Sequence, residues 1–227
     1  MYYNKQKLAF IVTGRFLAVV VLALLLLWPA SGSTVAFEFE SAPTATDNPL
    51  SLGFQFTTNV IMTVSRLGYY DDGGDGLLTS HQVGIFDAGG NLVVSATVSA
   101  GTADPLVGHF RYVDITPTVL WAISRYTIAA TSGGPSDPWA YGSSATISGL
   151  TFDPAINVAP TAGRFIYQDD EALHYPTDSF TYMVYAGPSF ELDLIPLPEP
   201  GTFVLLGSVF LVCLLSRSRR FRRLASH

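Results

Sequence analysis

The chain has 227 residues, a formal net charge of −6 and 48% hydrophobic residues. This length allows one ordinary domain with additional terminal segments. All 18 acidic residues lie between Glu38 and Glu199, where only four arginines accompany them. So acidic a segment repels phosphate backbones, which excludes nucleic acid as a partner.

The N-terminal residues 1–36 are predicted to be a signal peptide that is exported by the Sec translocon and cut by signal peptidase. Residues 16–28 form an apolar run, and small residues follow it directly, so cleavage is expected after Gly32 or after Ala36. An uncleaved membrane anchor is the alternative. The basic residues that precede the apolar run are Lys5, Lys7 and Arg15.

Residues 37–195 are predicted to form an all-β domain, because no stretch keeps helical spacing over three turns. Short strands with Gly- and Pro-rich turns favour a two-sheet antiparallel β-sandwich that is jelly-roll-like, with an immunoglobulin-like sandwich as the alternative. The expected strands are residues 52–57, 60–70, 81–86, 92–98, 110–115, 120–130, 145–152, 164–167, 180–185 and 190–194.

Two details of this strand pattern are specific. Residues 87–91 are expected to join two strands as a hairpin, with Leu92, Val94, Ala96 and Val98 on one face of the second strand. Pro117 is expected to break a strand and to lie at an edge or corner, since proline cannot donate a ladder hydrogen bond.

The sequence YYDDGGDGL contains the candidate metal ligands. Asp71, Asp72 and Asp75 lie on a tight glycine-rich loop, and three carboxylates suit Ca²⁺. The spacing does not match an EF-hand. The favoured interpretation is a solvated turn, because Asp and Gly are the usual turn residues.

Aromatic residues in a Gly- and Pro-rich segment are the candidate carbohydrate-binding residues. Trp139 and Tyr141 lie near the centre of residues 132–144, and an exposed Trp on such a loop indicates a binding surface. A Trp that closes the end of the sandwich is the alternative.

Catalytic motifs are not found. His81, His109 and His174 lack the spacing of a zinc site, and no nucleophile-elbow or P-loop sequence occurs. His174 lies near Glu171 and Asp178 in the sequence, a combination that suits acid–base chemistry but is expected by chance in an acidic domain. We therefore predict no enzyme activity and no cofactor other than the hypothetical Ca²⁺.

The C-terminal residues 196–227 contain a second apolar run at residues 202–215, which includes the only cysteine, Cys213. As a helix this run reaches about 21 Å, short of the bilayer's hydrocarbon core of about 30 Å, although flanking arginines and local thinning compensate. The arginines that follow it predict a cytoplasmic end, and they are Arg217, Arg219, Arg220, Arg222 and Arg223.

The order of Pro198-Glu199-Pro200, a short apolar run and an arginine cluster resembles the PEP-CTERM sorting signal of Gram-negative bacteria. The resemblance implies that an exosortase, a membrane protease, recognises the triplet and removes the tail. The protein would then be released, or attached to the cell surface, outer membrane or extracellular matrix. An ordinary tail anchor is the alternative.

Residues 50–193 resemble, in strand order and turn chemistry, an uncharacterised β-sandwich domain of PEP-CTERM proteins and other bacterial exoproteins. The resemblance implies no catalytic residues. We therefore expect an exported structural or adhesive protein, with exopolysaccharide as a candidate partner. A carbohydrate-binding module and a secreted polysaccharide hydrolase are the alternatives.

Overall fold

The computed structural model describes residues 32–47, 49–132, 137–159, 162–170, 172–181 and 183–195. The predicted sorting signal and residues 1–31 of the predicted signal peptide lie outside these ranges, whereas residues 32–36, which were also assigned to the signal peptide, are described. Within these ranges, no helix is long and apolar enough to cross a membrane.

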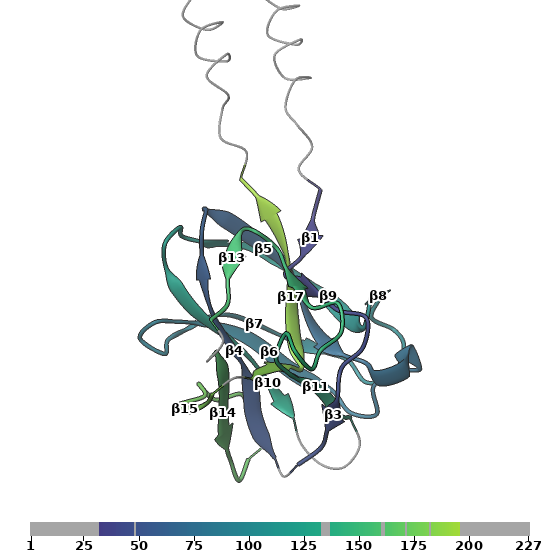
Figure 1. Ribbon diagram of the computed structural model, residues 1–227. Coiled ribbons are helices and arrows are strands. Elements are labelled where there is room, and N and C mark those ends of the chain that lie inside the picture. Colours follow the sequence, from purple (N-terminus) through teal and green to yellow (C-terminus); the bar gives the residue numbers. More distant parts are fainter. Residues whose placement is uncertain are drawn as a thin grey trace, which may run out of the picture. The chain divides into compact units, whose positions relative to one another are not determined.

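The described residues form antiparallel sheets, and their largest two pack face to face as a sandwich (Figure 1). The first has the strand order β1-β17-β5-β9-β8. Its strands are β1 (Thr34–Val35), β17 (Pro188–Leu194), β5 (Met62–Tyr70), β9 (Phe110–Leu120) and β8 (Leu106–Val107). The expectation of an all-β fold with antiparallel sheets is confirmed.

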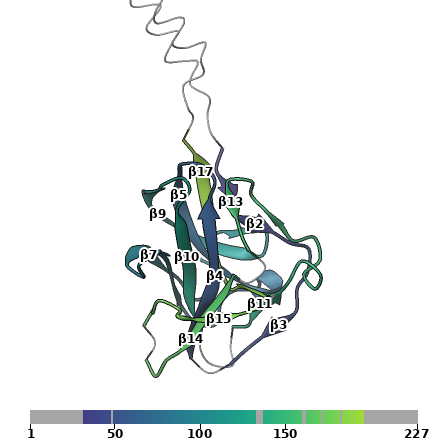
Figure 2. The same ribbon diagram turned by 60° about the vertical axis from the view of Figure 1, so that its left-hand side comes forward.

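The second large sheet has the order β15-β14-β4-β10-β6-β7, with β13 pairing β4 beside it. Figure 2 shows this edge of the sheet, where β14 pairs with β4 and β15 pairs with β14. The strands are β15 (Asp178–Phe180), β14 (Gly163–Tyr167), β4 (Leu50–Thr58), β10 (Arg125–Ser132), β6 (His81–Asp87), β7 (Leu92–Val98) and β13 (Ile156–Asn157).

Short strands complete the described part of the chain. The strands β16 (Val184–Ala186), β11 (Trp139–Gly142) and β3 (Thr44–Ala45) form one small sheet, and β12 (Thr151–Phe152) pairs with β2 (Phe37–Glu38). A single turn of 3₁₀ helix, η1 (Asp72–Gly74), follows β5.

Aromatic side chains hold the two large sheets together. Along β4, Leu52, Phe54 and Phe56 point inward and are almost fully buried, as alternation of apolar residues dictates. Phe56 of the second sheet meets Phe190 of the first, with ring centroids 5.1 Å apart. Burial of such rings is the main favourable term in the folding of a domain without disulfides.

The predicted hairpin at residues 87–91 is confirmed. The Asp87 carboxylate accepts hydrogen bonds from the backbone N–H groups of Gly89 and Asn91, at 2.8 and 2.9 Å. Gly90 has φ +81°, a conformation that favours glycine.

The face assigned to Leu92 was wrong. A register shift makes Leu92 oppose Phe86, while Val94 opposes Ile85, so Val93 is an extra residue in the ladder. A bulge of this kind moves Leu92 to the other face of the sheet. There its Cδ1 lies close to Gly84.

Pro117 does not break its strand, because β9 continues through it to Leu120. The ladder between β5 and β9 shifts between Val64 and Arg66, and Pro117 lies opposite this irregularity. No ladder hydrogen bond is needed there, so proline is tolerated. Beyond this strand, the expected strand 120–130 begins only at Arg125, because residues 121–124 form a turn.

Three other expectations are corrected. Of residues 145–152 only Thr151–Phe152 is a strand, and the segment 180–185 is divided between β15 and β16. The expected loop 132–144 contains strand β11. The strands β1 to β3, two residues each, were not anticipated.

A core substitution tests the packing of the two sheets. Replacing the fully buried Phe190 by alanine should lower the free energy of unfolding by about 3–5 kcal/mol. The matched control is Phe180→Ala, since Phe180 is 45% exposed at a sheet edge and should change stability by no more than about 0.5 kcal/mol. Urea unfolding measures both. Equal losses would contradict this assignment of the core.

Candidate functional site

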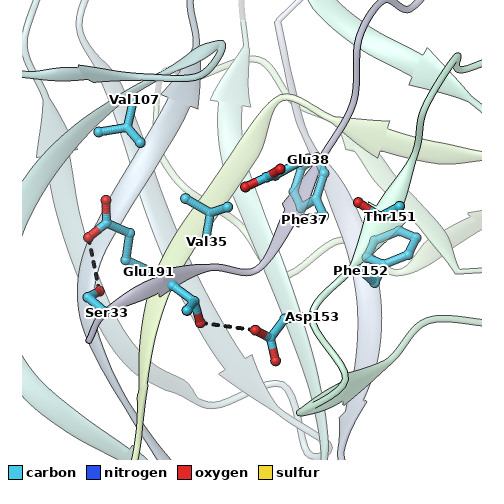
Figure 3. A pocket seen from close by; sticks show the side chains of 10 residues that line it. Ser33, Val35, Phe37, Glu38, Val107, Thr151, Phe152, Asp153 and Glu191 are labelled. Atoms are coloured by element: carbon cyan, nitrogen blue, oxygen red, sulfur yellow. Dashed lines mark hydrogen bonds between the residues drawn. The ribbon is translucent and has the colours of Figure 1, made fainter. Parts of the chain in front are cut away.

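An open groove lies beside the first and last strands of the domain (Figure 3). Its volume is about 440 Å³. Its carboxylates belong to Glu38, Asp153 and Glu191, and Phe37 and Phe152 contribute aromatic rings with centroids 5.7 Å apart. The remaining lining residues are Ser33, Thr34, Val35, Val107 and Thr151.

Two of the three carboxylates in the groove already bind neighbouring groups. Glu191 accepts hydrogen bonds from the Ser33 hydroxyl at 3.1 Å and from Arg66 Nη1 at 3.2 Å. Asp153 accepts one from the Thr34 hydroxyl at 3.0 Å. These contacts attach the first residues of the domain to the sandwich.

The candidate metal ligands are not brought together. Asp71 is buried and forms an ion pair with Arg111, with Nε and Oδ2 2.6 Å apart. Asp72 accepts a hydrogen bond from the Tyr70 hydroxyl at 3.0 Å, and Asp75 is exposed. Among the residues described, no group of three or more His, Cys, Asp or Glu side chains is placed to hold a metal ion.

Arg111 organises the two loops around Asp71. Its guanidinium donates to the backbone carbonyls of Gly74 at 3.0 Å, Asp104 at 2.9 Å and Thr102 at 3.3 Å. The Asp71 carboxylate also accepts a hydrogen bond from the backbone N–H of Gly76 at 3.1 Å. The ion pair therefore has the additional hydrogen bonds that a buried pair needs.

A second buried polar cluster joins the two large sheets. The rings of Tyr69 on β5 and His81 on β6 are stacked, with centroids 3.7 Å apart. The Tyr69 hydroxyl donates to Ser132 Oγ at 3.1 Å, and burial raises the pKa of Tyr69. His81 Nδ1 lies 2.8 Å from the carbonyl oxygen of Thr131, so this nitrogen carries a proton.

Asp137 completes this cluster from the far side of His81. His81 Nε2 lies 3.1 Å from Asp137 Oδ2. Burial opposes ionisation of Asp137, but backbone hydrogen bonds from Leu78 and Thr79, together with bonds from the Thr79 hydroxyl and His81, outweigh it. The pKa of Asp137 is consequently lowered from 3.8.

The candidate sugar-binding aromatic residues lie mainly inside the fold. Trp139 is only 5% exposed and packs with Leu50 and Leu52, so its ring offers no open face. Tyr141 is partly buried against the same cluster. The alternative interpretation, a Trp that closes part of the sandwich, agrees with this burial.

The histidine considered for acid–base chemistry has a different partner from those expected. His174 Nε2 lies 2.7 Å from Asp170 Oδ1 on the surface, and this hydrogen bond lowers the pKa of Asp170. Asp178 is an exposed residue of β15, and Glu171 lies outside the described residues. The sorting-signal residues also lie outside them.

Sequence reasoning missed Arg111, Asp137 and the groove. Arg111 lies 40 positions from Asp71, and Asp137 lies 56 positions from His81. No local motif connects residues so far apart. Alternation along the strand places Arg111 on the face opposite to the inward-pointing Phe110 and Tyr112, so the local pattern gives no signal that its charge is buried and paired.

Comparison with known proteins identifies a family but no activity. Residues 27–186 match the family model described as "Domain of unknown function (DUF4082)". No curated protein matches the chain. The match begins before β1 and ends with β16, so it spans most of the sandwich.

The buried ion pair is tested by removing one charge. Asp71→Asn leaves Arg111 buried without its counter-charge and should lower the free energy of unfolding by about 3–5 kcal/mol. Asp72→Asn, at the exposed neighbouring position, should change it by no more than about 0.5 kcal/mol. Thermal and urea unfolding measure both effects. A small loss in Asp71→Asn would show that the pair is dispensable.

Asp137 should make stability depend on pH. Because its pKa is lower in the folded state than in the unfolded chain, its contribution is present above the unfolded value of 3.8 and is lost as pH falls through the folded value. Asp137→Asn should be less stable at pH 7 and should lose less stability on acidification. Urea unfolding at pH 7 and at acidic pH, with Asp75→Asn as control, checks this. Identical pH profiles for wild type and Asp137→Asn would contradict it.

Proposed function

The chain belongs to the DUF4082 family, and from this premise we propose that it is an exported, exosortase-processed protein of the cell surface or extracellular matrix. Its β domain has a structural or adhesive role and no enzyme activity. The observation that carries the proposal is the position of the two ends of the domain.

The entry and exit of the domain are neighbours in one sheet. Strand β1 pairs antiparallel with β17, with Thr34 opposite Leu192 and Val35 opposite Glu191 (Figure 1). A signal peptide before β1 and a sorting signal after β17 therefore leave the domain from adjacent points. This suits a protein whose two terminal apolar segments enter the same membrane while the acidic domain stays outside.

The pairing of β1 also favours one of the two signal cleavage sites. Cleavage after Ala36 would remove β1, the backbone hydrogen bond from Ala36 to the Phe190 carbonyl at 2.9 Å, and the Ser33 and Thr34 contacts. Cleavage after Gly32 leaves all of them intact. We therefore propose Ser33 as the first residue of the mature protein.

The C-terminal triplet follows the domain at once. Only Pro196 and Leu197 separate Ile195, the last described residue, from Pro198. The prolines keep the triplet extended and outside any helix formed by the apolar run. It would be accessible to a membrane protease just outside the bilayer, after which the domain is released or attached.

The charged groups inside the domain support a structural role. Asp71 with Arg111, and Asp137 with His81, bind loops and sheets to one another.

In the chain order from β4 to β10, each long strand is followed by one in the opposite sheet, except in the β6–β7 hairpin. This alternation supports the jelly-roll-like sandwich over the immunoglobulin-like one. The buried Trp139 gives the carbohydrate-binding alternative no support.

Mass spectrometry of the protein from a Gram-negative host with exosortase tests the proposal. The mature protein should begin at Ser33, and no peptide from residues 202–227 should remain. A variant with Pro198, Glu199 and Pro200 all replaced by alanine should retain its tail. An intact tail in the wild-type protein would refute exosortase processing, and an N-terminus at Phe37 would refute the proposed signal cleavage.

A further inference from the structure

Exposed apolar side chains gather at one end of the β domain. We call Val60, Val119, Trp121, Ile123 and Leu194 the apolar tip. Trp121 is 64% exposed and Ile123 is 86% exposed, and the other three side chains are 40–47% exposed. Large apolar side chains clustered in water mark a surface that contacts something apolar.

Backbone contacts bring the segments of the apolar tip together. The backbone N–H of Ile123 donates to the carbonyl of Thr58 at 2.8 Å, and the Thr58 hydroxyl binds the carbonyl of Trp121. This joins the turn after β9 to the turn after β4. Met62 at the start of β5 lies between Leu120 of β9 and Leu194 of β17 in the sheet.

The backbone at the apolar tip is strained at a residue that exposes an apolar side chain. Ile123 has φ +56° and is the only non-glycine residue with positive φ among those described. A β-branched side chain disfavours this left-handed conformation, which Gly or Asn would adopt easily. Folding stability therefore does not explain an isoleucine here, and strain of this kind suggests a function.

The apolar tip lies at the end of the domain where the chain enters and leaves. Leu194 belongs to β17 one residue before Ile195, and β1 pairs with the same strand. Residues 196–201 alone connect Ile195 to the apolar run that starts at Thr202. Six extended residues span at most about 21 Å. A domain whose tail is inserted in a bilayer must therefore hold this end close to the lipid surface.

We propose that the apolar tip inserts into the lipid interface of the membrane that holds the unprocessed tail. Trp is suited to this region because its ring is apolar and its N–H is polar. Arg125, exposed next to the turn, suits lipid phosphates. The contact would hold the domain upright and present the Pro198–Pro200 triplet at a fixed height. This inference rests on the membrane anchoring in the proposed function.

Site-specific fluorescence tests the insertion in the full chain reconstituted into phosphatidylcholine vesicles. In a Cys213→Ser background, a polarity-sensitive dye is attached at Ile123→Cys. We expect the attached dye to emit severalfold more strongly than the same dye free in detergent-free buffer. Spin-labelled lipid should quench its emission, and aqueous iodide should not. The control is the dye at Leu78→Cys, because Leu78 is 70% exposed and follows the opposite end of β5. That dye should stay accessible to iodide.

Flotation of the same vesicles separates the two hypotheses. If the chain floats with the vesicles but the Ile123 dye is as accessible to iodide as the Leu78 dye, anchoring stands and the inserted tip is refuted. If the chain does not float with the vesicles, both the membrane anchoring and the insertion of the apolar tip are refuted.

A strain-relieving variant distinguishes a lipid contact from a structural role. With the dye at Val60→Cys, Ile123→Asn should reduce lipid quenching at least twofold. The unfolding midpoint of this variant should be unchanged or higher, because asparagine tolerates the left-handed conformation. Unchanged quenching, or a lower midpoint, would overturn the proposal.

Discussion

Strand β1 pairs with β17, so the first and last strands of the domain lie side by side in one sheet. The groove forms beside this pairing, and its carboxylates bind Ser33 and Thr34. The direction in which the chain enters and leaves depends on the same contact. The proposed signal cleavage after Gly32 and the proposed presentation of the Pro198–Pro200 triplet both depend on this pairing.

Inside the sandwich, buried polar groups act as connections between elements. Tyr69 and His81 stack across the two large sheets, and Asp137 binds His81 from a third segment. Arg111 and Asp71 hold the glycine-rich loop after β5. Such groups are costly unless their hydrogen bonds are satisfied. Among the described residues, no fully buried side-chain polar atom lacks a hydrogen-bond partner.

Local patterns predicted the long strands and the hairpin at residues 87–91 because these depend on alternation and on turn chemistry within a few residues. Two-residue strands such as Thr34–Val35 have no detectable period, so β1 was absorbed into the expected signal peptide. The bulge at Val93 reversed the face of Leu92, since one extra residue moves a side chain across the sheet. Trp139 has no local feature that separates an exposed loop residue from a buried strand residue.

The sequence alone predicted the all-β class and raised the expectation of signals at both ends, and it showed the acidic character of the central segment, because composition, periodicity and charge are properties of neighbouring residues. Only the tertiary structure shows which carboxylates are paired with a positive charge, where the two ends of the domain meet and which apolar side chains remain exposed to water. These outcomes depend on contacts between distant positions, such as Asp71 with Arg111 and Thr34 with Leu192. The spacing of these residues in the sequence does not predict such contacts, because strand pairing and burial bring the residues together only in the folded protein.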